Sequence, residues 1–160
     1  MHEESAYDLE GRSRIVVGVD GSAASRYALA WAARQAELTG LQLVAVTVWV
    51  FPTNWGWSAP WPADFDPKAN ACGILEEAIT AVLGPKPAVD VERLVTEGHA
   101  APVLVELSAC AELVVVGSRG HGEFAGMLLG SVSEFLTTHS HCPVVVVRGD
   151  ELASERGAAA

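Results

Sequence analysis

The chain alternates short apolar runs with segments of helical character, and this alternation limits the fold more than any other feature. In the first run, residues 14–20, apolar side chains hardly alternate with polar ones. Such a run predicts a strand buried on both faces. Further strands are predicted at 41–50, 89–95, 112–117 and 143–148. Helices are predicted at 25–37, 70–83, 101–110 and 132–141.

Strands that alternate with helices predict an α/β fold with an open, doubly wound parallel sheet of five strands. Right-handed crossovers would place helices on both faces of this sheet. The segment 89–95 alternates apolar and polar residues, so we expect it at an edge. With a strand order of 3-2-1-4-5, the winding direction reverses between the first and fourth strands, where such sheets bind ligands.

The length of 160 residues suits one domain, predicted at 14–148 between a flexible lead at 1–13 and a flexible tail at 149–160. Residues 51–67 hold four prolines and three tryptophans and are predicted to form an irregular loop. Trp55, Trp57 and Trp61 could form a lid, a partner patch or a cover for the open end of the sheet. Cover or dimer packing is the favoured interpretation.

The formal net charge of −10 argues against a nucleic-acid partner or an anionic membrane surface. A nucleotide stays possible, because local backbone amides can bind phosphate in an acidic protein. Three widely spaced cysteines form no zinc or redox pattern, which favours a reducing, cytoplasmic location. We expect no signal peptide, because residues 1–13 are polar, and no membrane span.

A glycine-rich stretch, residues 117–133, carries the clearest functional signal. It follows a predicted buried strand and leads into a predicted helix. Glycines allow backbone N–H groups to approach an anion, and Ser131 and Ser133 place hydroxyls at the helix N-terminus. The stretch is neither a Walker loop nor a dinucleotide fingerprint, because the lysine of the first and the glycine spacing of the second are missing. It predicts a phosphate site, with a purely structural turn as the alternative.

A second informative turn, Val19-Asp20-Gly21-Ser22, follows the first strand and would meet the glycine stretch in one crevice. Asp20 could accept hydrogen bonds from ribose hydroxyls or an adenine amine, or could simply stabilise the turn. Arg119 could neutralise phosphate or lie in solvent. Backbone groups near Thr47 and Val48 could contact an adenine edge.

These residues resemble the universal stress protein family. The resemblance covers residues 14–148, from the opening Val-Gly-Val-Asp-Gly-Ser to the closing His-Cys-Pro-Val-Val-Val-Val. Its most specific part is G-x2-G-x9-G-[ST], which here is Gly117, Gly120, Gly130 and Ser131. The resemblance implies the adenine nucleotide alpha-hydrolase-like fold and membership of the ATP-binding branch. Within this branch it implies ATP, with Mg²⁺, as the ligand.

Carried over by position, the resemblance implies two groups of ligand contacts. The adenosine contacts would be Gly18, Val19, Asp20 and Val48. The phosphate contacts would be Gly117, Arg119, Gly120, Gly130, Ser131, Val132 and Ser133, with His121 nearby. A homodimer through the fifth strand is also implied, since an apolar edge strand needs covering. The function implied is a nucleotide-dependent regulator that reports energy state to a protein partner.

Two other functions stay open. A slow ATP hydrolase would need an oriented water, and His121 and Glu123 are the candidate bases. A nucleotide-independent dimeric interaction module would act through the tryptophan loop. The sequence does not separate ATP from ADP or cyclic AMP. His139 and His141 are not expected to hold a metal, because their spacing does not aim both rings at one point.

Overall fold

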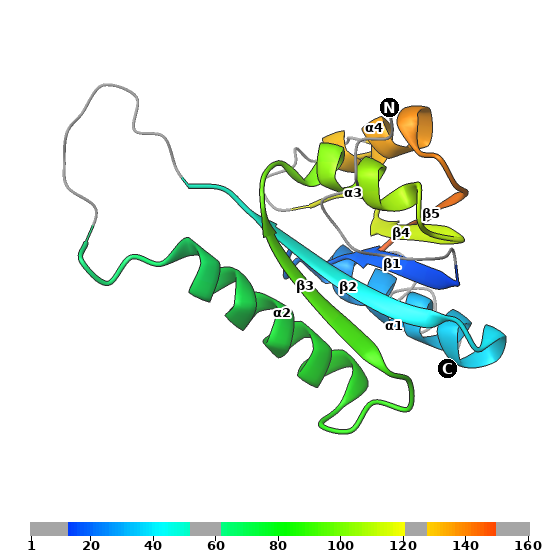
Figure 1. Cartoon of the computed structure of the whole chain (residues 1–160), viewed down its shortest axis with the longest axis horizontal. Helices are drawn as coiled ribbons and strands as arrows, with labels where there is room; N and C mark the ends of the chain where they lie inside the picture. The colour runs from blue at the N-terminus through cyan, green and yellow to red at the C-terminus, as the bar shows by residue number, and fades with distance from the viewer. Residues whose placement is uncertain (1–12, 52–61, 121–127, 150–160) are drawn as a thin grey trace, which may run out of the picture.

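The computed structural model describes residues 13–51, 62–120 and 128–149. Its five strands are β1 (Arg14–Gly18), β2 (Gln42–Trp49), β3 (Val91–Glu97), β4 (Leu113–Gly117) and β5 (Val144–Val147). Its four helices are α1 (Ala23–Thr39), α2 (Pro67–Leu83), α3 (Ala100–Ser108) and α4 (Ser131–His139). All strand pairs are parallel, and the order β3-β2-β1-β4-β5 confirms the predicted topology (Figure 1).

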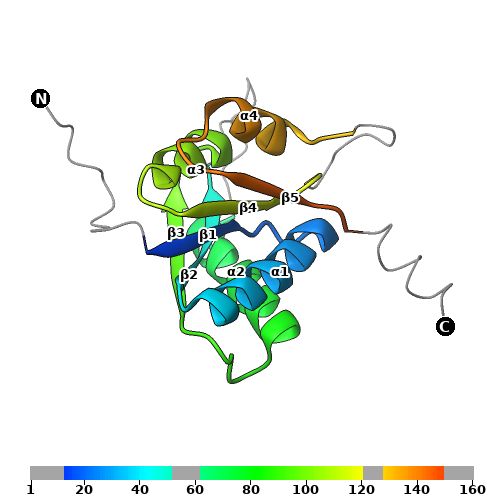
Figure 2. The same cartoon turned by 90° about the vertical axis from the view of Figure 1, so that its right-hand side faces the viewer.

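The helices cover both faces of the sheet, as predicted. Figure 2 shows α1 and α2 on one side of the strands and α3 and α4 on the other. Ile15 and Val17 of β1 belong to the core under α1 and α2, whereas Val16 belongs to the core under α3 and α4. Since successive side chains of a strand point to opposite faces, both faces of β1 are apolar. This explains why the run 14–20 lacks the alternation of a half-exposed strand.

The edges of the sheet are β3 and β5, which confirms the prediction for the segment 89–95. Val144, Val145 and Val146 of β5 are only partly buried. No helix in the described part of the chain is long and apolar enough to cross a membrane.

Helix ends differ from the predictions by a few residues. The largest difference is at α2, which starts at Pro67 rather than at residue 70. The Asp66 side chain accepts a hydrogen bond from the Ala69 amide (3.0 Å), and Pro67 takes the first helical turn, where its missing N–H costs nothing. Helices α3 and α4 each end two residues earlier than predicted. Gly40 ends α1 in the left-handed conformation (φ 73°), as its position predicts.

Several predictions concern residues outside the described ranges. They are the lead at 1–12, the tail from 150 onward, Trp55, Trp57, Trp61, His121 and Glu123. The assignment of residues 14–148 as one domain stays a prediction.

Candidate functional site

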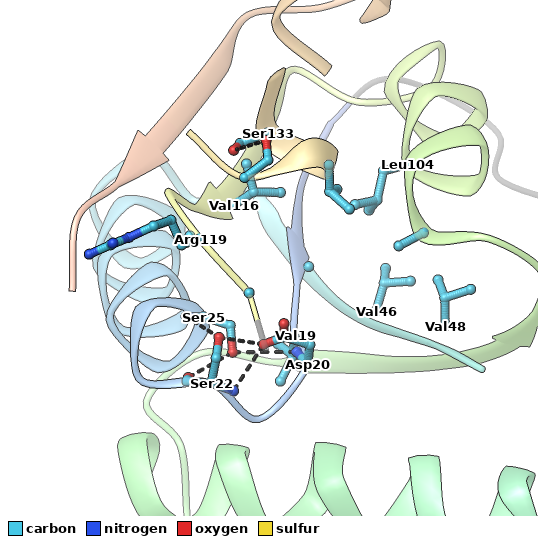
Figure 3. Close-up of a pocket in the computed structure, with 16 residues that line it drawn as sticks. Val19, Asp20, Ser22, Ser25, Val46, Val48, Leu104, Val116, Arg119 and Ser133 are labelled. Carbon is cyan, nitrogen blue, oxygen red and sulfur yellow. Dashed lines mark hydrogen bonds between the residues drawn. The ribbon is translucent and has the colours of Figure 1, made fainter. Parts of the chain in front are cut away.

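A cleft that is open to solvent lies at the carboxyl ends of β1, β2 and β4. This is the crevice where the winding of the sheet reverses. Figure 3 shows its walls: Val46 and Val48 from β2, Leu104 from α3, the turn Val19–Ser25, and Arg119.

Ten of the eleven predicted ligand contacts line this cleft. They are Gly18, Val19, Asp20, Val48, Gly117, Arg119, Gly120, Gly130, Val132 and Ser133. The eleventh, Ser131, is exposed on α4 and is not part of the lining. The two turns therefore meet in space as predicted, although they are about a hundred residues apart in the sequence.

Six lining residues were not predicted. They are Ser22, Ser25, Val46, Ala100, Leu104 and Val116. Ser22 and Ser25 follow Asp20 at the start of a helix, a signal that points to capping and therefore to this end of the sheet. Ala100 and Leu104 belong to α3, and their sequence gives no sign that this helix covers the cleft.

The turn after β1 is held by a local network of hydrogen bonds. The Asp20 carboxylate oxygen Oδ1 accepts from the Ser22 amide (2.9 Å) and from the Ser22 hydroxyl. Ser22 Oγ in turn accepts from the Ser25 amide and caps α1. The Asp20 amide donates to Ser25 Oγ (3.3 Å). These bonds fix the carboxylate at the rim of the cleft, although the residue itself is exposed.

Backbone groups of Val19 and β2 form the floor of the cleft. The Val19 amide donates to the Val46 carbonyl (2.8 Å), and the buried Thr47 hydroxyl donates to the Val19 carbonyl (2.8 Å). The β1–β2 pairing ends at Gly18 and Val46, so Val48 lies two residues beyond the last pair. In a parallel ladder, alternate residues direct both backbone groups toward the same neighbour. The backbone of Val48 therefore faces the cleft, past the end of β1.

Close packing explains two glycines of the motif. A Cβ on Gly117 would lie 2.8 Å from the Ala24 carbonyl carbon and 2.9 Å from the Ser25 nitrogen, both in the backbone of α1. A Cβ on Gly120 would lie 2.7 Å from Asp20 Oδ2. At Gly117 the glycine is required because β4 and the start of α1 approach each other closely, whether or not a phosphate binds nearby.

The start of α4 differs from the prediction of a serine-capped helix. The N-cap is Gly130, and no side chain caps the helix. Ser133 is buried, and its hydroxyl donates to the carbonyls of Ser118 (3.1 Å) and Gly130 (3.0 Å). The Gly130 amide also donates to the Ser118 carbonyl (2.6 Å). Ser133 thus links Ser118, which follows β4, to Gly130 at the start of α4. Its hydroxyl hydrogen is bonded to protein carbonyls rather than offered to a ligand.

The amides at the start of α4 supply the positive potential that the sequence predicts here. The first helical bond runs from the Glu134 amide to the Gly130 carbonyl, so the amides of residues 131–133 precede it. Gly130, Val132 and Ser133 line the cleft, which brings the positive end of this nine-residue helix to it. Arg119, which is partly buried, adds a formal positive charge, and its side chain points away from Val46 and Val48 (Figure 3).

Asp20 and Arg119 are the ionisable side chains of the cleft lining as described. Within residues 13–51, 62–120 and 128–149, no three His, Cys, Asp or Glu side chains gather as metal ligands. The cleft therefore combines an apolar end at Val46, Val48 and Leu104 with a polar end of amides, a guanidinium and one carboxylate. This division fits a ligand with a flat apolar part and an anionic part.

Comparisons with known proteins agree with this description. The model of the universal stress protein family matches residues 11–148. Universal stress protein Rv2624c of Mycobacterium tuberculosis is 40% identical over 144 residues, which cover 88% of this chain and 51% of that protein. The chain spans about half the length of these curated relatives.

Solved structures show the same fold. A universal stress protein in complex with cAMP superposes with a TM-score of 0.63 at 30% identity, covering 87% of this chain and 98% of that chain. The universal stress protein UspA from Lactobacillus plantarum superposes with a TM-score of 0.67 at 21% identity, covering 87% and 100%.

Proposed function

Because this chain belongs to the universal stress protein family, we propose that it binds an adenine nucleotide in the cleft and acts as a nucleotide-dependent regulator in the stress response. The observation that carries the proposal is the cleft itself, where an apolar end on β2 and α3 adjoins the amides of α4. The relative of 30% identity that was solved in complex with cAMP supports an adenine nucleotide as the ligand.

The adenine ring would lie at the apolar end, between Val46, Val48 and Leu104. The backbone of Val48 offers an N–H donor and a carbonyl acceptor to the ring edge, which itself carries an acceptor nitrogen and an amine donor. Backbone recognition of this kind distinguishes adenine from guanine, because guanine presents a carbonyl where adenine has the amine. The ribose would then lie near Val19 and Asp20.

The phosphates would lie against the first turn of α4. The amides of residues 131–133 and the positive helix end favour an anion there. Arg119 would add charge neutralisation. Mg²⁺ usually keeps several waters and binds phosphate oxygens, so it needs few protein carboxylates. Asp20 is the described carboxylate that could contact it, which fits Mg²⁺ bound mainly through ATP.

A cytoplasmic homodimer that pairs through β5 completes the proposal. Val144, Val145 and Val146 are partly buried, and β5 is an edge strand of the sheet that the described residues form, so a second copy could pair with it. Sedimentation of the purified chain would report a dimer, and Val145→Lys would shift it to monomer. A wild-type chain that sediments as a monomer at high concentration would contradict this part.

Calorimetric titration with AMP, ATP·Mg²⁺ and cAMP tests the proposed site. Ala100→Phe would fill the cleft from the start of α3, whereas Ala109→Phe changes an exposed residue at the other end of the same helix. We expect wild type and Ala109→Phe to bind at least one nucleotide and Ala100→Phe to lose that binding. Absence of binding by wild type, or equal binding by all three proteins, would refute the site.

A further inference from the structure

The backbone conformation at residue 120 does not require glycine. The described glycines with positive φ are Gly21, Gly40, Gly84 and Gly98, so Gly120 has a conformation open to other residues. A Cβ there would lie 2.7 Å from Asp20 Oδ2, and Asp20 is the described residue that it would meet within 4 Å. The space beside Gly120 is therefore taken by a side chain from the other turn.

The Asp20 carboxylate cannot easily move out of that space. Its Oδ1 accepts from the amide and the hydroxyl of Ser22. Ser22 caps the seventeen-residue α1 through the Ser25 amide. These contacts connect the carboxylate to a long, well-packed helix and hold Oδ2 in place beside Gly120.

We propose that Asp20 is a positioning residue: its carboxylate is the surface against which Gly120, and with it the neighbouring Arg119, is placed. This inference rests on the proposed nucleotide site. Asp20 would set the distance between the part of the cleft that holds the nucleoside and the part that holds the phosphate. The role depends on the volume of the side chain at Oδ2 rather than on its charge. It differs from a contact in which the carboxylate only accepts hydrogen bonds from the ligand.

A double-mutant cycle separates these roles. Gly120→Ala is made in three backgrounds: wild type, Asp20→Ala and Asp20→Asn. Asp20→Ala removes the atoms that a Cβ on residue 120 would meet. Asp20→Asn keeps them and removes only the charge, so it is the matched control. Melting temperature without ligand is the first measurement, and affinities for AMP and adenosine are the second.

We expect Gly120→Ala to lower the melting temperature by about 3 °C or more in wild type and in Asp20→Asn, and by less than about 1 °C in Asp20→Ala. We expect AMP affinity to fall about tenfold in the first two backgrounds and to change less than about twofold in the third. Within each background, adding Gly120→Ala should change the affinity for adenosine, which lacks the phosphate, by less than about twofold, a pattern that a general loss of stability would not give.

Equal effects of Gly120→Ala in all three backgrounds would overturn the proposal, and so would relief by Asp20→Asn as complete as relief by Asp20→Ala. If Gly120→Ala does not fold alone, folding of the double variant with Asp20→Ala supports the proposal, and failure of both overturns it. If wild type binds no nucleotide, the proposed function fails, while the melting temperatures still test the contact between Asp20 and Gly120.

Discussion

Gly117→Ala tests whether the motif glycine at the end of β4 is needed for packing. The new Cβ would lie 2.8 Å from the carbonyl carbon and the Cβ of Ala24, about 0.6 Å inside the 3.4 Å limit of ordinary contact. The obstacle is the backbone of α1, so no rotamer change relieves it. Overpacking of this kind costs about 1–3 kcal/mol, and a rigid neighbour places the expected cost near the upper end.

In a chain of this size each kcal/mol shifts the melting temperature by about 2–4 °C, so a drop of roughly 5–10 °C is expected. Two other glycines provide a calibrated comparison. A Cβ on Gly18 would meet the flexible Leu104 Cδ1 at 3.3 Å, so Gly18→Ala should cost clearly less. A Cβ on Gly73 meets nothing within 4 Å inside α2, so Gly73→Ala should stabilise by about 0.5–1 kcal/mol.

Thermal unfolding followed by far-UV circular dichroism, without nucleotide, gives the order of stability of the four proteins. The expected order is Gly73→Ala, wild type, Gly18→Ala, Gly117→Ala, from the most to the least stable. A Gly117→Ala variant that melts within about 1 °C of wild type would refute the packing argument. If this variant then lost nucleotide binding, the cause would be a direct clash between the new methyl group and the nucleotide.

Three further predictions follow from the hydrogen bonds. Ser133→Ala should speed hydrogen exchange of the Gly130 amide in the nucleotide-free protein, because the base of the loop opens; Ser131→Ala, on the exposed face, should not. Exchange unchanged in both variants would refute the structural role of the Ser133 hydroxyl. Asp66→Ala should destabilise by about 1 kcal/mol in urea unfolding through loss of the N-cap of α2, and Asp66→Asn by much less. Thr47→Val should lower the free energy of unfolding by about 1–3 kcal/mol, because the Val19 carbonyl loses its buried hydrogen-bond donor. An unchanged midpoint of urea unfolding would contradict this.

The architecture was predictable from the sequence because its strongest signals are local. The run at 14–20 lacks alternation because both faces of β1 are covered, and that pattern is visible without any knowledge of the partners. Once strands and helices alternate, handedness and crossover rules leave few topologies, and the two turns must meet at the same edge.

The remaining features depend on tertiary geometry that no local pattern records. Pro67 looked like part of a loop, because proline breaks most helices, yet at the first helical turn it is favourable. Ser133 was expected to offer its hydroxyl to a ligand, but the hydroxyl donates a hydrogen bond to the carbonyl of Ser118 instead. Leu104 lies in the cleft only because of how α3 crosses the sheet, and its residue type gives no hint of that position.

The central claim is that an adenine nucleotide occupies the cleft between the turn after β1 and the start of α4. Amide spectra of ¹⁵N-labelled protein, recorded during titration with AMP and with adenosine, test it residue by residue. The account predicts that both ligands shift the amides of Val19 and Val48, and that AMP alone shifts Arg119 and Val132. Unchanged spectra, or shifts confined to residues outside the cleft, would contradict it.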